Sequence, residues 1–411
     1  MDLLPDDVLV QVMSLLSLPE VFQLRLVCSR FAALALHRDV WRLRGVGDAS
    51  DLFDADPWSC RALRLAPCLD SVRVSLSASC PECHQLFTAP CAARSLTITA
   101  VGGEGALLAA RLIAHQRGLG RLREIDIHLV SRVSSSNADR EASKAHASTL
   151  FETLASTPGL RVLSIGGCDD YHVPAEPAGP VLASLRRLAC QLTPAVPRVL
   201  DSLLAGHAAT LREVSLSSYC FPSWSSSSST ALLLAGLPLL AVLKCPMLPG
   251  MDALVACASL RKVILLLDGN QAAPEEAVSS SVRGVVEAAA AFFRRAHQLR
   301  AVHVHGSSDL TNAVEVVSAL ASSGRSCVEA LCIDNNLSQN SELMLALLGA
   351  LQSLCTPGRS HNLRLCINVL WGAEAGRSLL AAATANPNPE PHVRVSEGPK
   401  CLDDHECLAY V

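Results

Sequence analysis

Residues 122–127 read Leu-Arg-Glu-Ile-Asp-Ile, and this short stretch decides the fold. Its leading leucine and its two isoleucines are separated by polar residues, and the two isoleucines alternate with acidic ones. Alternation with a period of two is typical of a β-strand that buries one face and leaves the other open. The stretch therefore predicts a short, half-buried strand.

The same pattern returns along most of the chain, as an apolar residue followed by apolar residues three and five positions later. Copies lie at Leu69-Val72-Val74, Leu96-Ile98, Leu122-Ile125-Ile127, Leu160-Leu163-Ile165, Leu185-Leu188-Cys190, Leu211-Val214-Leu216, Leu240-Leu243-Cys245, Leu260-Val263-Leu265, Leu299-Val302-Val304, Val328-Leu331-Ile333, Leu365-Ile367 and Val393-Val395. Their mean spacing is about 29 residues, with extremes of about 20 and about 39 on either side of Leu260. Twelve copies predict twelve strands.

Helical patterns fill the segments between many of these strands, over residues 107–115, 149–155, 282–297, 313–321 and 341–354. Two further segments, 131–146 and 223–230, are polar and longer than a turn requires, so we expect loops there. Such loops serve either as recognition elements or as solvated spacers. The implied unit is a strand followed by a helix.

This unit resembles the leucine-rich-repeat family, in particular its long-repeat class with one helix per turn. The resemblance implies an α/β solenoid over residues 69–398, with about twelve irregular repeats, parallel strands on the concave side and helices on the convex side. A C-terminal tail, 399–411, would follow. The asparagine expected after each strand is clear only at Asn336, while Cys168 and Asp268 hold that position elsewhere. We therefore expect irregular turns.

Composition restricts the possible partners. Of 411 residues, half are hydrophobic but only 4% are aromatic, and the net charge is −4 without a long basic run. We therefore expect many small repeated core positions and no nucleic-acid partner. No secretory leader or membrane-spanning stretch is recognisable. The 17 cysteines are accordingly expected as reduced thiols in a cytoplasmic or nuclear protein.

The first forty residues follow a different, helical pattern. Pro5 suits a helix start, and Asp6 and Asp7 in the first turn complement the helix dipole. A second helix start follows at Pro19-Glu20. Residues 8–36 carry more apolar side chains than these helices can bury against one another, so we expect another surface to cover them. The alternative is a helical cap that seals the solenoid end.

The segment from Leu4 to Trp41 resembles the F-box. The resemblance rests on Leu4-Pro5, Asp7, Leu9, Val12-Met13, Leu16, Glu20-Val21, Val27-Cys28, Phe31, Leu34 and Val40-Trp41. Phe31 stands where the family more often has tryptophan, and Val21 where leucine is commoner. The implied domain is 1–45, followed by a linker or first helical cap over 46–68.

The resemblance implies a function as well. An F-box docks on a Skp-family adaptor, which joins it to the cullin and the RING subunit of an SCF-type ubiquitin ligase. The chain would then be a non-catalytic substrate-recognition subunit without a cofactor, and its repeats would bind a protein substrate. The residues expected to contact the adaptor are Leu4, Pro5, Leu9, Val12, Met13, Leu16, Val21, Leu24, Val27, Phe31 and Trp41.

Alternation along the predicted strands places a second set of side chains on the concave face. These residues, expected to bind the substrate, are Glu124, Asp126, His128, Arg187, Glu213, Lys244, Lys262, Ile264, His303, His305, Asp334 and Arg364. Their mixed charge favours no single type of partner. Ile264 and Leu266 are expected to be exposed there as apolar contacts, unless the inserted loops cover them.

Cys80, Cys83, His84 and Cys91 form the one group with spacing suited to zinc. His84 directly follows Cys83, which makes simultaneous ligation awkward, so buried or surface thiols are the other interpretation. Residues 401–407 gather further Cys, Asp, His and Glu side chains, which a solvated tail also explains. We find no nucleophile elbow, phosphate-binding loop or paired carboxylates, and therefore predict no catalysis. The competing function is a scaffold that binds a signalling protein or small GTPase without ubiquitin transfer.

Overall fold

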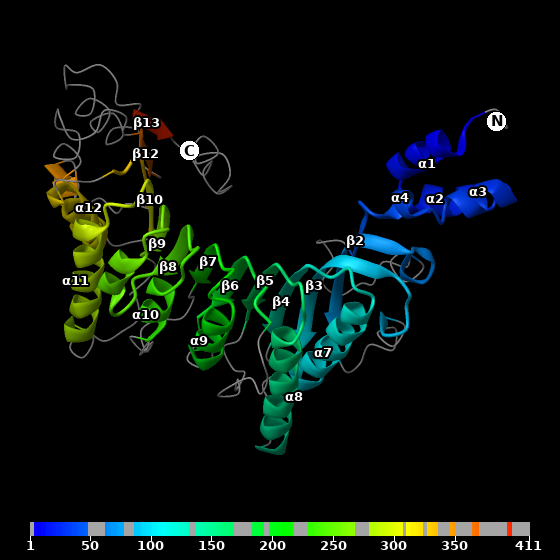
Figure 1. Cartoon of the computed structure of the whole chain (residues 1–411), viewed down its shortest axis with the longest axis horizontal. Coiled ribbons are helices and arrows are strands. Elements are labelled where there is room, and N and C mark those ends of the chain that lie inside the picture. Colours follow the sequence, from blue (N-terminus) through cyan, green and yellow to red (C-terminus); the bar gives the residue numbers. More distant parts are fainter. Residues whose placement is uncertain are drawn as a thin grey trace. The chain divides into compact units, whose positions relative to one another are not determined.

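A computed structural model describes residues 4–47, 62–77, 86–130, 137–167, 182–192, 197–217, 229–267, 279–306, 310–323, 327–335, 346–347, 349–350, 364–369 and 393–396. The chain divides into two units, Met1–Leu188 and Ala189–Val411. Figure 1 shows their helices and strands. Each unit is described by itself.

The first unit begins with four short helices, α1 (Asp6–Leu15), α2 (Leu18–Leu24), α3 (Ser29–Leu34) and α4 (Arg38–Trp41). Helix α2 starts at a capping box, in which the Glu20 carboxylate accepts hydrogen bonds from the backbone N–H and the hydroxyl of Ser17, both at 2.7 Å. Trp41 is fully buried among these helices and donates its indole N–H to the carbonyl of Ala35 at 2.6 Å. We call residues 4–44 the N-terminal module.

Parallel strands follow in the first unit: β1 (Gly45–Val46), β2 (Cys68–Leu76), β3 (Ala92–Val101), β4 (Glu124–Val130) and β5 (Val162–Gly166). Each pairs with the next in chain order. Helix α7 (Gly102–Gly118) packs on β2, β3 and β4, and α8 (Asn137–Ala155) lies beside α7 (Figure 1). Strand β6 (Arg187–Gln191) spans the point where the two units divide.

The second unit repeats this arrangement. Its parallel strands, again paired in chain order, are β7 (Glu213–Ser217), β8 (Val242–Pro246), β9 (Lys262–Leu266), β10 (Ala301–Gly306), β11 (Ala330–Asn335), β12 (Arg364–Val369) and β13 (Val393–Ser396). Between them lie α9 (Pro197–Gly206), α10 (Ser229–Ala235), the 3-10 helix η1 (Met251–Ala256), α11 (Ser279–Arg295) and α12 (Leu310–Ser322).

All twelve predicted strands are present, and the mixed α/β, solenoid-like arrangement of parallel strands and helices is confirmed. The sheet begins earlier than residue 69, however, because β1 already pairs with β2. The expected loop over 131–146 is wrong for residues 137–146, which belong to α8. That segment is polar but rich in Ala, Glu and Lys, which favour helix. The shortest interval, after Leu240, contains η1, whereas an α-helix follows each of β3, β4, β6, β7, β9 and β10.

The strands bury the face that the helices cover. In β4 the side chains of Ile125, Ile127 and Leu129 are buried, while Asp126 and His128 on the other face are exposed. Within the part of the chain that the structure describes, no helix is both long and apolar enough to cross a bilayer.

Candidate functional site

Helix α1 has two apolar sides. Leu9, Val10 and Met13 are buried in the module core. Val8, Val12 and Leu15 recur at helical spacing on another side of the same helix and are exposed, Leu15 to 87%. We call Val8, Val12 and Leu15 the α1 stripe. Burial of the first set fixes how α1 sits in the module, and this orientation leaves the stripe open to solvent.

Exposed apolar side chains concentrate in the N-terminal module. Leu26 and Val27, in the turn between α2 and α3, are 87% and 65% exposed. Among the described residues, eight of the eleven large hydrophobic side chains that are exposed lie between Leu4 and Leu43. Large apolar groups gathered in this way on a solvent-exposed surface are characteristic of a protein interface. The module is therefore the best candidate for a docking site.

The predicted adaptor contacts divide into three groups. Leu4, Pro5, Val12 and Val27 are exposed and Leu16 and Leu24 are half-buried, but the buried ones are Leu9, Met13, Val21, Phe31 and Trp41. This buried group forms the core of the module. The sequence prediction leaves out five exposed apolar residues of the module, which are Val8, Leu15, Leu26, Leu36 and Leu43. Helical spacing from Val12 was the signal that could have found Val8 and Leu15.

Two arginines hold the module together. Arg30 on α3 donates to the Asp6 carboxylate at 2.9 and 2.6 Å and to the carbonyl of Leu4 at 2.6 Å. Arg44 donates to the carbonyls of Met13 and Val40, both at 2.6 Å, and burial lowers the pKa of its guanidinium. These bonds fix the start and the end of α1 and so present the α1 stripe on a rigid support.

The module is joined directly to the sheet. The carbonyl of Arg44 accepts the backbone N–H of Asp70 at 2.8 Å, and Gly45 and Val46 pair with Ser71 and Val72. The next connection comes from Arg121, which donates to the carbonyl of Arg42 at 3.1 Å. The docking surface is thereby positioned relative to the first repeats.

The open face of β2 to β5 is polar. Arg73, Thr97, Asp126 and Ser164 stand in register across the four strands. Asp126 and His128 are exposed, as predicted, whereas Glu124 is half-buried and forms an ion pair with Arg94 at 3.0 Å. Polar groups held in such rows by a rigid sheet can make hydrogen bonds to a bound polypeptide.

The corresponding face differs in the second unit. Ile264 is only 5% and Leu266 only 9% exposed, so their predicted exposure is wrong. His303 is buried as well. Its ring lies edge to face with that of His305, and the two ring centroids are 6.2 Å apart. Apolar residues on both sides of a strand are typical of a strand covered on both faces.

The remaining predicted substrate contacts are scattered. Arg187 is exposed, and the half-buried ones are Glu213, Lys244, Lys262 and His305. The side chains of Asp334 and Arg364 lie outside the described part of the chain.

The zinc prediction is largely untested, because Cys80, Cys83 and His84 lie outside the described residues, as does the cluster at 401–407. Cys91 is fully buried, and this burial raises the pKa of its thiol to about 12. Where the structure describes side chains, no three His, Cys, Asp or Glu residues gather as a metal site.

Comparison with known proteins agrees with this placement of the docking site. Residues 1–44 match the family model described as F-box-like, and the match ends at Arg44, the residue that joins α4 to the sheet. No curated protein matches the chain significantly. F-box domains bind Skp-family adaptors, in keeping with an exposed apolar surface. The N-terminal module of this chain is an F-box-like domain.

Proposed function

We propose that the chain is a substrate-recognition subunit of an SCF-type cullin-RING ubiquitin ligase. The F-box-like module binds the Skp-family adaptor, and through it the cullin and the RING subunit. The strand–helix array, of leucine-rich-repeat type, binds a protein substrate. The observation that carries the proposal is the concentration of exposed apolar side chains in the module that matches the F-box-like family.

Docking would bury the α1 stripe. Fully burying one Val or Leu side chain contributes about 1.5–3 kcal/mol, and a few such side chains at the centre of an interface commonly dominate its affinity. Because Leu15 and Leu26 are the most exposed, they have the most to gain from a partner. Their loss should therefore weaken adaptor binding strongly.

The substrate would bind the open face of β2 to β5. This face is polar and accessible, with Arg73 and Asp126 exposed in one row, and it belongs to the same unit as the module. The chain itself would perform no bond chemistry. Its contribution would be proximity, since it would hold the substrate near the ubiquitin-loaded enzyme. We expect it to act in the cytoplasm or nucleus.

Purification of the full chain with the Skp-family adaptor and cullin tests the proposal. We expect Val12→Glu combined with Leu15→Glu to weaken adaptor binding at least about tenfold, because a charge would be buried at the contact. Leu232→Glu is the matched control, as it changes an exposed leucine on α10 in the other unit. All variants should keep the circular dichroism spectrum and thermal stability of the native chain, since exposed positions tolerate substitution.

Undiminished adaptor binding by the stripe variant would contradict the docking surface. Recovery of a signalling protein or small GTPase with the full chain, without adaptor or cullin, would favour the scaffold function over the ligase.

A further inference from the structure

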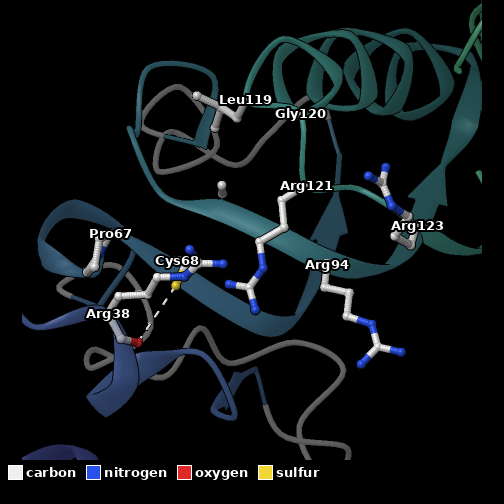
Figure 2. A pocket seen from close by; sticks show the side chains of 9 residues that line it. Arg38, Pro67, Cys68, Arg94, Leu119, Gly120, Arg121 and Arg123 are labelled. Atoms are coloured by element: carbon white, nitrogen blue, oxygen red, sulfur yellow. Dashed lines mark hydrogen bonds between the residues drawn. The ribbon is translucent and has the colours of Figure 1, made fainter. Parts of the chain in front are cut away.

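A pocket of about 540 Å³ lies where α4 of the F-box-like domain approaches the first long strands of the sheet (Figure 2). Four of its lining side chains are arginines: Arg38 from α4, Arg94 from β3, and Arg121 and Arg123 from the segment that leads into β4. None of its lining residues is acidic. The pocket therefore concentrates positive charge in a chain whose net charge is −4.

Only one of the four arginines has a carboxylate partner among the residues that the structure describes. Arg94 forms ion pairs with Asp70 at 3.6 Å and Glu124 at 3.0 Å, and its side chain points away from Arg38 and Arg121 (Figure 2). Arg38 and Arg121 instead point toward one another beside Cys68 (Figure 2). Two guanidinium groups in this arrangement repel one another unless an anion lies between them.

The hydrogen bonds of Arg121 also indicate that an acceptor is missing. Its Nη2 donates to the carbonyl of Arg42 at 3.1 Å, whereas its Nη1 is buried and has no hydrogen-bond partner within the described part of the chain. A buried donor without an acceptor is costly. An oxyanion in the pocket would accept this bond.

Arg121 is held by its bond to the Arg42 carbonyl, and Arg94 and Arg123 are placed by backbone hydrogen bonds of the sheet. The N–H of Arg123 donates to the carbonyl of Arg94 at 2.8 Å, and the N–H of Arg161 to the carbonyl of Arg123 at 2.7 Å. In the sequence, Leu-Arg pairs such as Leu122-Arg123 and Leu160-Arg161 mark the positions at which these backbone hydrogen bonds form. Preorganised charge binds an anion with little loss of conformational freedom.

We propose that Arg38 and Arg121 clamp a phosphate monoester, with Arg123 adding to the attraction. A phosphate monoester carries close to two negative charges and three terminal oxygens, which is enough to bind two guanidinium groups. A carboxylate has only two oxygens, and a single guanidinium group already binds both. A phosphorylated side chain of a bound protein and a small free phosphate share this chemistry. The inference does not depend on the ubiquitin-ligase proposal.

Calorimetric titration of the full chain tests the site, with inorganic phosphate, O-phosphoserine and a phosphoserine peptide as probes and the unphosphorylated peptide as the blank. We expect the phosphate probes to bind and Arg38→Gln and Arg121→Gln each to weaken them about tenfold. Arg111→Gln removes the same charge from an exposed position on α7, so it separates a specific clamp from general electrostatic attraction.

Tighter binding of the phosphopeptide than of phosphoserine would support the clamp with a phosphorylated protein as its ligand. Equal binding would support it with a small phosphate. Absence of binding by every phosphate probe, or an equal loss in Arg111→Gln, would overturn the proposal. Arg38 is exposed, so its variant should fold even if Arg121→Gln does not, and circular dichroism checks both.

Discussion

Gln116 on α7 and Cys91 ahead of β3 are joined by a buried hydrogen bond, in which the Gln116 side-chain Nε2 donates to the Cys91 carbonyl at 2.9 Å. The Gln116 Oε1 also accepts the backbone N–H of Ala93 at 2.8 Å. One side chain thus pairs a donor and an acceptor of the backbone where the strand begins. Helix α7 is thereby fixed to the sheet that carries the arginine pocket.

Gln116→Leu should destabilise the fold, because it leaves two buried backbone groups without partners. We expect the free energy of unfolding to fall by about 2–4 kcal/mol, measured by urea denaturation. Arg111→Leu on the exposed side of the same helix should change it by less than about 0.5 kcal/mol. Equal effects of the two substitutions would show that the amide bonds contribute nothing.

Alanine substitution should lower the stability of the fold at one glycine of α7 but not at another. A Cβ at Gly105 would lie 2.7 Å from the carbonyl oxygen of Leu76, whereas one at Gly118 would meet nothing within 4 Å. We expect Gly105→Ala to destabilise by about 1–3 kcal/mol through overpacking, and Gly118→Ala to be neutral or stabilising by up to about 1 kcal/mol. Thermal unfolding measures both, and a stable Gly105→Ala variant would mean that α7 can shift away from β2.

The strands were predictable because each alternates buried and open side chains over a few residues. Ile125 and Ile127 show this locally, without knowledge of the rest of the chain. Strand β1 was missed because Gly45 and Val46 are too few to show a period, and their pairing with Ser71 and Val72 is fixed only by the folded chain.

The docking surface was harder to predict because α1 is apolar on two sides. Both Leu9 and Leu15 are leucines in the same helix, yet Leu9 is 6% and Leu15 87% exposed. Only packing against α3 and α4 decides which side faces inward. The arginine pocket required the fold too, since Arg38 and Arg121 are far apart in the sequence. By contrast, the apolar pair Ile264 and Leu266 could have indicated a strand covered on both faces.

Thiol alkylation should distinguish the cysteines by burial. Burial raises the pKa values of the Cys91 and Cys245 thiols to about 12, so both stay protonated and unreactive at neutral pH. Cys28, in the turn next to Val27, is exposed. We expect iodoacetamide to label Cys28 in the native chain, as measured by peptide mass spectrometry, and Cys91 and Cys245 only after unfolding. Rapid native labelling of Cys91 would contradict its burial.

Stability should fall in mild acid because of His207. Burial lowers the pKa of His207 to about 4, from about 6.5 in an unfolded chain. Between these pH values the unfolded chain binds the proton more tightly, so the contribution of neutral His207 is fully present above about pH 6.5 and is lost as the pH falls toward about 4.

Because one pKa unit corresponds to about 1.4 kcal/mol, we expect a loss on the order of 3 kcal/mol between these pH values. Urea denaturation at several pH values measures it. His207→Gln should flatten this part of the profile, since no proton binds there. The control, His128→Gln at an exposed histidine, should leave the profile unchanged. If instead the native and His207→Gln chains lost stability in parallel, other groups would account for the acid sensitivity.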